Sequence, residues 1–218
     1  MENKEKNPWP TKAAMEQVYE KKLWGCNQTD FYSGEGSHRA EIVNPYITEV
    51  TAFLTLFKNK LTVCDLGCGD FNVGKELVPH TQQYIAVDIV PSLIARNKEK
   101  FKAPNLEFHC MDLATADLPS AECAIVRQVL QHLSNAEVQN IVSKLTNYKY
   151  IILTEHIPKG EFVPNKDIIS GQGNRLKKQS GVNLLAPPFN FKVNEARQLS
   201  AVVLKDGKGV IVTTLFKL

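Results

Sequence analysis

The chain has 218 residues, of which 43% are hydrophobic, and carries a formal net charge of +3. This length is enough for one domain with a sizeable core, and the composition is ordinary for a globular protein. The small net charge argues against a dedicated nucleic-acid-binding protein, and the short basic run RLKK at 175–178 is expected to be a solvated surface.

The cysteines and the ends of the chain indicate a reducing compartment. There are five cysteines, an odd number, and none lies in a CxxC pair. Cys64 and Cys68 flank a glycine turn rather than forming a zinc-binding pair, so no metal is expected. Residues 1–10 lack the apolar core of a signal peptide, and no apolar run is long enough for a membrane span. We therefore expect a cytoplasmic monomer or homodimer.

Two helices separated by a loop are predicted in the first quarter of the chain. Apolar residues recur at helical spacing over residues 11–23 and 40–57, the second helix being bent or interrupted near Pro45. The intervening loop combines three glycines with aromatic residues such as Trp24 and Tyr32. Because aromatic rings are costly to expose to water, we expect this loop to pack over another part of the molecule.

The stretch LTVCDLGCGD at residues 61–70 is the most informative in the chain. An apolar strand ends in Asp65, and Gly67 and Gly69 follow before a predicted helix. A strand that leads through a glycine turn into a helix is typical of a nucleotide-binding site, although the pattern is not the dinucleotide fingerprint GxGxxG. Glycines at this place allow a tight turn and a close approach of the ligand to the backbone.

Two further strands deliver acidic residues at their carboxyl ends. The strand at residues 83–88 ends in Asp88, about 20 residues after the glycine turn, where an acid accepts hydrogen bonds from ribose hydroxyls. The strand at residues 106–110 is followed by Asp112. Because the carboxyl ends of parallel strands meet at one edge of a sheet, these acids are expected to lie together.

The remaining elements alternate between strand and helix, which predicts a parallel sheet. Residues 91–101 form a helix with proline in its first turn, and residues 134–145 form a helix that opens with a capping box of Ser134 and Glu137. Strands are predicted at residues 124–126 and 150–154, and residues 201–216 read as a hairpin around a DG turn.

These features together resemble the class I S-adenosylmethionine (SAM)-dependent methyltransferases. DLGCGD is similar to their first motif, VD to their ribose-binding acid and MDL to their adenine-contacting segment. The resemblance covers residues 61–218 and departs from many members at Phe71, where they carry a third glycine. It implies an α/β, Rossmann-like three-layer sandwich with a mostly parallel seven-stranded sheet and an antiparallel C-terminal hairpin strand. Residues 1–60 are then an N-terminal helical cap or lid packed on the core of residues 61–218.

The resemblance also implies a set of cofactor-binding residues. The loop at residues 27–39 is expected to be a lid over the methionine end of SAM, with Tyr32, Ser37 and His38 or Arg39 approaching it; the alternative is a passive surface loop. Arg127 and Gln128 would lie near the reactive methyl group. The full set of candidates is Tyr32, Ser37, Asp65, Gly67, Cys68, Gly69, Asp88, Ile89, Asp112, Leu113, Arg127 and Gln128.

Candidates for a general base follow the fourth and fifth strands. His132 titrates near neutral pH, although it could instead cap or pack against the helix. Glu155 and His156 are expected at the end of the fifth strand, where they could instead simply begin the following loop. The polar stretch 156–190 is long enough to be suspected of binding the acceptor. Its APPF segment is similar to an N-methyltransferase motif but lacks the amide or acid, so we interpret it as a rigid turn with Phe189 near the acceptor pocket.

The favoured function is methyl transfer from SAM to a small-molecule acceptor, giving S-adenosylhomocysteine as the second product. An oxygen acceptor is inferred from the missing N-methyltransferase motif and from His132 and His156. The alternatives are a methyltransferase that acts on protein or RNA, and a SAM-binding partner subunit without catalytic activity. No DNA partner is expected, because the net charge is small.

Overall fold

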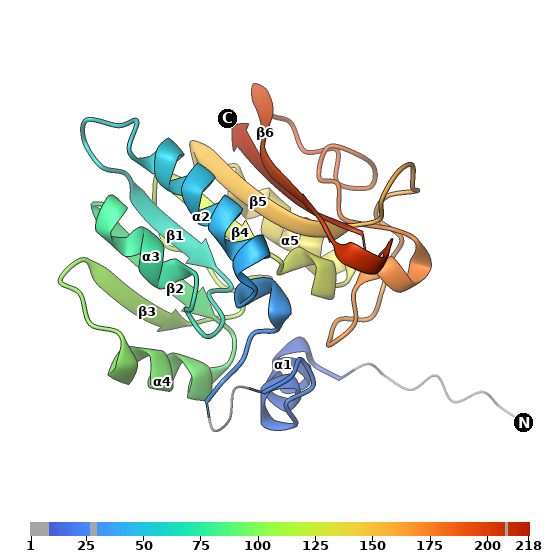
Figure 1. Ribbon diagram of the computed structural model, residues 1–218, viewed down its shortest axis with the longest axis horizontal. Coiled ribbons are helices and arrows are strands. Elements are labelled where there is room, and N and C mark those ends of the chain that lie inside the picture. The colour runs from blue at the N-terminus through green and yellow to red at the C-terminus, as the bar shows by residue number, and fades with distance from the viewer. Residues whose placement is uncertain (1–8, 27–29, 208) are drawn as a thin grey trace, which may run out of the picture.

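The computed structural model describes residues 9–26, 30–207 and 209–218. A seven-stranded sheet in the order β3-β2-β1-β4-β5-β7-β6 forms its centre (Figure 1). The strands are β1 (Thr62–Leu66), β2 (Gln83–Asp88), β3 (Leu106–Cys110), β4 (Cys123–Arg127), β5 (Tyr150–Ile157), β6 (Glu195–Val203) and β7 (Val210–Lys217). β1 to β5 are mutually parallel, and β7 runs antiparallel to both β5 and β6. The predicted fold class is therefore confirmed.

The helices lie where the sequence pattern places them. They are α1 (Thr11–Glu20), α2 (Ala40–Leu54), α3 (Gly74–Leu77), α4 (Pro91–Lys100) and α5 (Asn135–Leu145). The predicted capping box at the start of α5 is present, because the Ser134 side chain accepts from the Glu137 amide and the Glu137 side chain accepts from the Ser134 amide. α2 continues through Pro45 without the interruption that we expected.

Two of the strands extend by several residues beyond their predicted bounds, and both differences come from pairing. β5 extends beyond Thr154 to Ile157, because Glu155, His156 and Ile157 pair with Val212, Ile211 and Val210 of β7. β6 begins at Glu195 rather than at residue 201, because its first residues pair with the end of β7. Neither pairing partner is local in the sequence, so the run of polar residues at these places was not recognised as strand.

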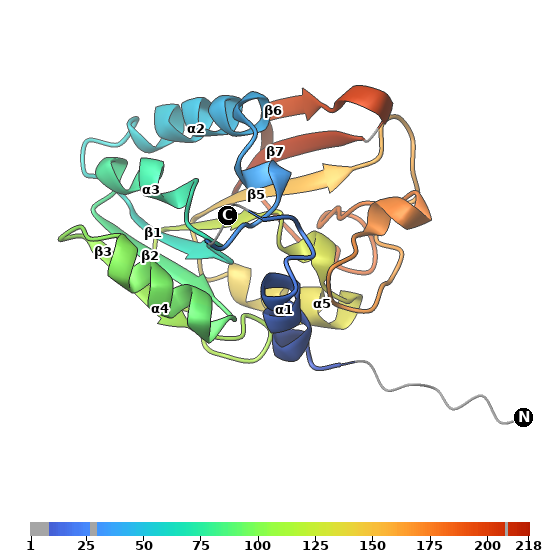
Figure 2. The same cartoon turned by 60° about the horizontal axis from the view of Figure 1, so that its bottom comes forward.

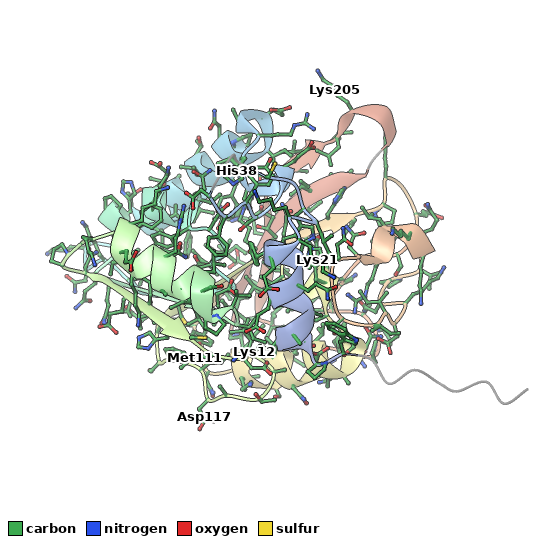
Figure 3. All side chains as sticks on the ribbon, turned by 90° about the horizontal axis from the view of Figure 1, so that it is seen from below. Lys12, Lys21, His38, Met111, Asp117 and Lys205 are labelled. Carbon is green, nitrogen blue, oxygen red and sulfur yellow. The ribbon has the colours of Figure 1, made fainter. Side chains whose placement is uncertain are left out.

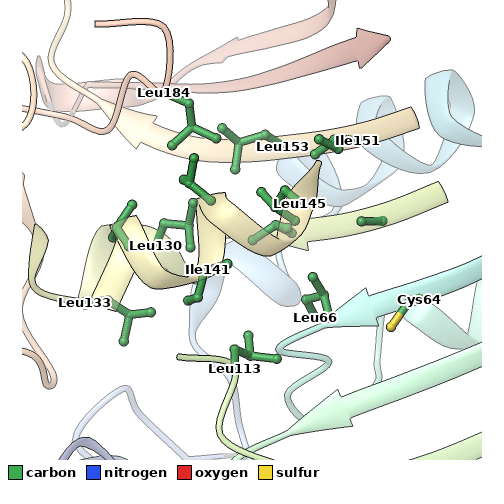
Figure 4. Packing of buried hydrophobic residues seen from close by; sticks show 14 of the residues in the cluster. Cys64, Leu66, Leu113, Leu130, Leu133, Ile141, Leu145, Ile151, Leu153 and Leu184 are labelled. Carbon is green, nitrogen blue, oxygen red and sulfur yellow. The ribbon is translucent and has the colours of Figure 1, made fainter. Parts of the chain in front are cut away.

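The side chains of each central strand point alternately to two hydrophobic clusters, one on each face of the sheet. Cys64 and Leu66 pack with Ile141 and Leu145 of α5 (Figure 4). Val63 packs on the opposite face with Val50 and its neighbours in α2. Figure 2 shows α2 and α3 on one side of the sheet and α5 on the other. This alternation directs Asp65 toward α2.

The carboxyl ends of the parallel strands are covered by the N-terminal part of the chain. α1 lies in front of these ends in Figure 2. Figure 3 looks onto this cover, with Lys12 and Lys21 at opposite ends of α1 and His38 in the segment that joins it to α2. We call residues 30–39 the strap. In the part of the chain that the structure describes, no helix is both long and apolar enough to cross a bilayer.

Candidate functional site

A cavity of about 320 Å³ lies between the strand ends, α1 and the strap. It brings together most of the residues that the sequence analysis singled out. The predicted residues that line it are Ser37, Asp65, Gly67, Cys68, Gly69, Asp88, Ile89, Asp112, Leu113, Arg127, Gln128, His132 and His156. Tyr32 and Glu155 are not among its lining residues.

The glycine turn is fixed by bonds to β2 and by protein neighbours. The backbone amides of Gly67 and Cys68 both donate to the Val87 carbonyl, at 2.8 and 2.9 Å. Gly67 and Gly69 have φ angles of +92° and +56°, which favour glycine. A Cβ atom at Gly67 would lie 2.3 Å from the Val129 side chain. The close approach that the structure shows at Gly67 is therefore to the Val129 side chain, whereas we expected a ligand there.

Phe71 takes the place of the third glycine that many class I methyltransferases carry. Its φ angle is +62°, and its side chain is buried. The ring packs edge-on against Tyr84, Phe101 and Phe108, with centroids 4.8–5.7 Å apart. These aromatic contacts stabilise the left-handed backbone conformation of Phe71.

Asp88 lies at the end of β2 with its carboxylate against the glycine turn. Oδ2 accepts from the Gly69 amide at 3.0 Å and Oδ1 from the Val90 amide at 3.1 Å. Burial raises the pKa of Asp88, and these amides oppose the rise. A carboxylate has about four acceptor sites. This carboxylate therefore keeps acceptor capacity for hydroxyl groups of a ligand in the cavity.

The other two strand-end acids differ in their surroundings. Asp65 is buried and accepts from the Tyr84 hydroxyl at 2.8 Å. Burial raises the pKa of Asp65 to about 7, although the Tyr84 hydrogen bond and the nearby Arg127 charge act in the opposite direction. Asp112 accepts from the Ala114 amide at 2.8 Å and so stabilises the turn after β3. Asp112, Leu113 and Ile89 all line the cavity.

Arg127 connects the end of β4 to the strap. Nη2 donates to the Gly36 carbonyl, and Nη1 donates to the Ser37 hydroxyl at 3.3 Å. The guanidinium carbon lies 4.8 Å from the centroid of the Tyr46 ring in α2. Gln128 follows with a φ angle of +56°, and its side-chain amide lies where a Cβ atom at Gly36 would be.

The strap is also bonded to the glycine turn through Asp70. The amide of Asp70 donates to the Ser33 hydroxyl, and Asp70 Oδ2 accepts from the Ser33 amide, each at 2.8 Å. His38 Nε2 lies 2.6 Å from the same oxygen. No local sequence pattern indicates this role of Asp70, because its partners His38 and Ser33 lie 32 and 37 residues away.

Side chains of α4 bond to both the glycine turn and the strap. Asn97 is fully buried and donates to the Gly69 carbonyl at 2.8 Å. Arg96 donates to the Asp70 carbonyl at 2.8 Å and forms an ion pair with Asp30. Asn97 follows Leu93 and Ile94 at helical spacing, so the sequence places it on the buried face of this helix. A buried asparagine needs polar partners, and this signal could have identified Asn97.

Tyr32 does not line the cavity and stacks on His38, with ring centroids 4.2 Å apart. The expectation that Tyr32 approaches a cofactor is therefore not met in this arrangement. Residues 27–29 of the expected lid lie outside the described residues. Within the described part, Ser33, Gly34, Gly36 and Ser37 line the cavity.

His132 lines the cavity but is poorly suited to act as a base. Nδ1 lies 2.9 Å from the Gly173 carbonyl, and Nε2 lies 3.0 Å from the side-chain nitrogen of Gln131. Gln131 Oε1 accepts from the His156 amide, so its nitrogen is the donor to His132. Burial lowers the pKa of His132 to about 4. The ring is therefore neutral at pH 7, and its lone pair is already engaged.

Glu155 and His156 project to opposite faces of the sheet because they are consecutive residues of β5. His156 lines the cavity, whereas Glu155 is buried on the α5 face and lies inside the strand rather than at its end. Its carboxylate oxygens have no hydrogen-bond partner among the described residues. Burial raises the pKa of Glu155 to about 8. This placement removes Glu155 from the candidate catalytic groups.

The segment from 156 to 190 contributes little to the cavity apart from His156, Gln172 and Asn174. Phe189 packs in the hydrophobic core, so the expectation that it lines the acceptor pocket is wrong. Arg175 is buried rather than solvated, contrary to our interpretation of the RLKK run. Its guanidinium donates to the carbonyls of Leu130, Leu133 and Lys166 and to the Asn135 side chain.

Residues 63–148 match the protein family described as "Methyltransferase domain". An uncharacterized RNA methyltransferase of Chlamydia pneumoniae is 25% identical over 154 residues, which are 64% of this chain and 38% of that protein. Phosphoethanolamine N-methyltransferase 1 of Triticum aestivum is 25% identical over 153 residues, 66% of this chain and 29% of that protein. A malonyl-[acyl-carrier protein] O-methyltransferase of Acetivibrio thermocellus is 33% identical over 63 residues, 28% of this chain and 22% of that protein. The matches thus span less than two fifths of these relatives.

Solved structures confirm the fold. The N-methyltransferase NodS from Bradyrhizobium japonicum, in complex with S-adenosyl-L-homocysteine, superposes with a TM-score of 0.66 at 12% identity, covering 94% of this chain and 98% of that one. Magnesium protoporphyrin IX methyltransferase from Synechocystis PCC 6803, with bound SAH, superposes with a TM-score of 0.61 at 16% identity, covering 96% and 100%. At these identities the likeness concerns the fold alone.

Proposed function

We propose that the protein transfers a methyl group from SAM to a small-molecule acceptor. The premise is that residues 63–148 form a methyltransferase domain within the Rossmann-like fold of the class I SAM-dependent methyltransferases. The observation that carries this proposal is one covered cavity that combines the glycine turn with Asp65, Asp88 and Asp112. The neighbours with bound SAM or S-adenosylhomocysteine support the choice of cofactor.

The residues of the cavity fit this cofactor in three parts. Asp88 has acceptor sites left for the ribose hydroxyls, and Ile89, Asp112 and Leu113 border a space suited to a flat base. Asp65, Arg127 and Gln128 lie at the other end, where the methionine part would be held. When bound, SAM supplies an electrophilic methyl group on a sulfonium.

The protein's contribution to methyl transfer is alignment and exclusion of water rather than strong acid–base catalysis. α1 and the strap cover the strand ends, with Ser33, Gly36 and Ser37 facing the cavity. Burial lowers the pKa of His132, and Gly173 and Gln131 engage its two ring nitrogens, so we assign His132 to the wall of the acceptor space. His156 also lines the cavity and is the remaining candidate base for the acceptor. Residues 1–60 act in this proposal as the cap of the core.

A small acceptor suits a cavity that is covered by α1 and the strap better than a polymer does. The curated relatives act on different classes of acceptor by name, one of them being an RNA methyltransferase. An RNA strand would have to reach strand ends that α1 and the strap cover, and the net charge is only +3. We therefore favour a small acceptor, and we propose oxygen as its nucleophilic atom.

The test is turnover of methyl-labelled SAM in the presence of a small-metabolite extract, with S-adenosylhomocysteine as the measured product. Label in an extractable small molecule supports the proposal. Label in RNA or protein fractions would replace it with the polymer alternative. Tight binding of S-adenosylhomocysteine without transfer to any fraction would instead indicate a SAM-binding subunit without catalytic activity.

A further inference from the structure

Arg175 is the most deeply buried charged side chain of the described residues, at 1% exposure, and no step of the proposed reaction uses it. Burying a guanidinium costs free energy that an apolar side chain of similar volume would not, so a buried arginine needs a reason besides stability. The carboxyl groups of Glu155 and Asp167 influence the pKa of Arg175, but among the described residues neither forms an ion pair with it. Its hydrogen bonds to neutral oxygens therefore hold the explanation.

Two of these bonds fix a short 3₁₀ helix, η3 (Leu130–His132), which follows β4. Arg175 Nη1 donates to the Leu130 carbonyl at 2.9 Å, at the start of η3. Nη2 donates to the carbonyl of Leu133, directly after its end, at 2.8 Å. A planar guanidinium can bind both carbonyls in one fixed arrangement, which the single ammonium group of a lysine cannot do.

The same side chain closes a loop that lies beside η3. Arg175 Nε donates to the Lys166 carbonyl at 3.1 Å, so residues 166–175 return on themselves. Gln172 and Asn174 of this loop line the cavity. The Gln172 carbonyl accepts from Nε1 of Trp24, at the end of the N-terminal cap, at 3.2 Å. Arg175 therefore joins two cavity-lining segments, η3 and the loop.

His132 shows that the two segments form one wall. Its ring belongs to η3, and Nδ1 lies 2.9 Å from the Gly173 carbonyl of the loop. The ring also packs on Trp24, with centroids 4.9 Å apart. The position of His132 thus depends on how far η3 and the loop are from each other, and Arg175 fixes this separation.

We propose that Arg175 is a positioning residue that sets the wall of the acceptor space, formed by Gln131, His132, Gln172 and Asn174. Arg175 does not itself line the cavity. The inference rests on the proposed function, because such a wall affects the reaction only where an acceptor is methylated. Methyl transfer needs the acceptor aligned with the reactive methyl group, and a misplacement of about 1 Å lowers a rate by about hundredfold.

Arg175→Lys tests the proposal, because it keeps the charge and removes the planar set of donors. We expect its affinity for S-adenosylhomocysteine in calorimetry to stay within about twofold of the wild type. Transfer of labelled methyl groups from saturating SAM to a small-metabolite extract should become at least about tenfold slower. Lys177→Met, at an exposed position of the same turn, is the matched control and should keep the wild-type rate. Equal losses of affinity and rate in Arg175→Lys would mean that Arg175 supports the whole fold, and would overturn the proposal.

A second readout follows the wall without turnover. Burial lowers the pKa of His132 to about 4, and NMR titration of its ring, assigned with His132→Gln, measures this value. We expect the pKa to rise by about one pH unit or more in Arg175→Lys, because a displaced wall admits water. The charge of Arg175 also lowers the pKa of His132, so a rise in Arg175→Met alone would report the lost charge and not the lost position.

The two readouts together decide the outcome. An unchanged His132 pKa in Arg175→Lys, or a raised pKa with an unchanged rate of transfer, overturns the positioning role. If the wild type itself transfers no methyl group, the proposed function fails. The His132 titration in Arg175→Lys then decides by itself whether Arg175 sets the wall.

Discussion

Ser33 and Asp70 exchange two hydrogen bonds: the Asp70 amide donates to the Ser33 hydroxyl, and the Ser33 amide donates to the Asp70 carboxylate, both at 2.8 Å. This pair joins the strap to the glycine turn of β1. The same carboxylate contacts His38 and accepts from the Asn72 amide. The Asp70 side chain therefore bonds both to the strap and to the glycine turn beneath it.

Replacing this side chain should release the strap. In Asp70→Ala the amide of Ser33 and the ring of His38 lose their acceptor, and a hydrogen bond to a charged group contributes about 1.5–3 kcal/mol. We expect amide exchange of residues 33–38 to become at least about tenfold faster. Hydrogen exchange followed by mass spectrometry measures this. Asp117→Ala, in an exposed loop, is the control, and equal exchange in both variants would mean that Arg127 and Arg96 hold the strap without Asp70.

Asp88 should dominate binding of the ribose. Asp88→Ala removes the acceptor for two hydroxyls, so the affinity for S-adenosylhomocysteine should fall at least about tenfold in calorimetry. The variant also removes the acceptor for the Gly69 and Val90 amides, which would loosen the turn. Asp88→Asn, which retains one oxygen, shows whether the loss follows the ligand or the turn. Unchanged affinity in both variants would refute the ribose assignment.

Gly67 should be required for stability through Val129. A Cβ atom at Gly67 would lie 2.3 Å from the Val129 side chain, and its φ angle of +92° is unfavourable for alanine. Gly67→Ala should therefore lower the free energy of unfolding by about 1–3 kcal/mol or more. Adding Val129→Ala removes the clash but not the backbone strain. We expect partial recovery in the double variant by chemical denaturation; strictly additive losses would contradict the contact.

Glu155 should make the protein less stable as the pH rises from about 5 to 8. Its pKa is raised to about 8 from an ordinary value of 4.5, so within this interval the folded state holds a proton that the unfolded state has released. Raising the pH then favours unfolding, by up to about 1.4 kcal/mol per pH unit, until the folded pKa is passed.

Glu155→Gln removes the titrating carboxyl group and should flatten the pH dependence of the denaturation midpoint between pH 5 and 8. At pH 8 the variant should be more stable than the wild type. Glu161→Gln, at an exposed position, controls for the change of net charge. A slope that is the same in both variants would show that other groups carry the pH dependence.

Local patterns in the sequence determined the architecture. Short apolar runs with an acid at or just after their ends predicted β1, β2 and β3, and the Ser134–Glu137 pair predicted the start of α5. Both kinds of prediction succeed because side-chain alternation in strands and helix capping depend on residues that are close in the sequence. The glycines and Asp88 identified the nucleotide site for the same reason. These features require no knowledge of distant partners.

Only the tertiary structure decided which polar residues face the cavity. β5 continues through Glu155 and His156 because β7 pairs with it, and strand alternation then sends one side chain to the cavity and the other into the core. Asp70 finds its partners in the strap, Arg175 is buried by carbonyls from residues 130–166, and Arg127 meets Tyr46 of α2. Each contact joins segments far apart in the chain, so its energy depends on packing that no local pattern of residues encodes.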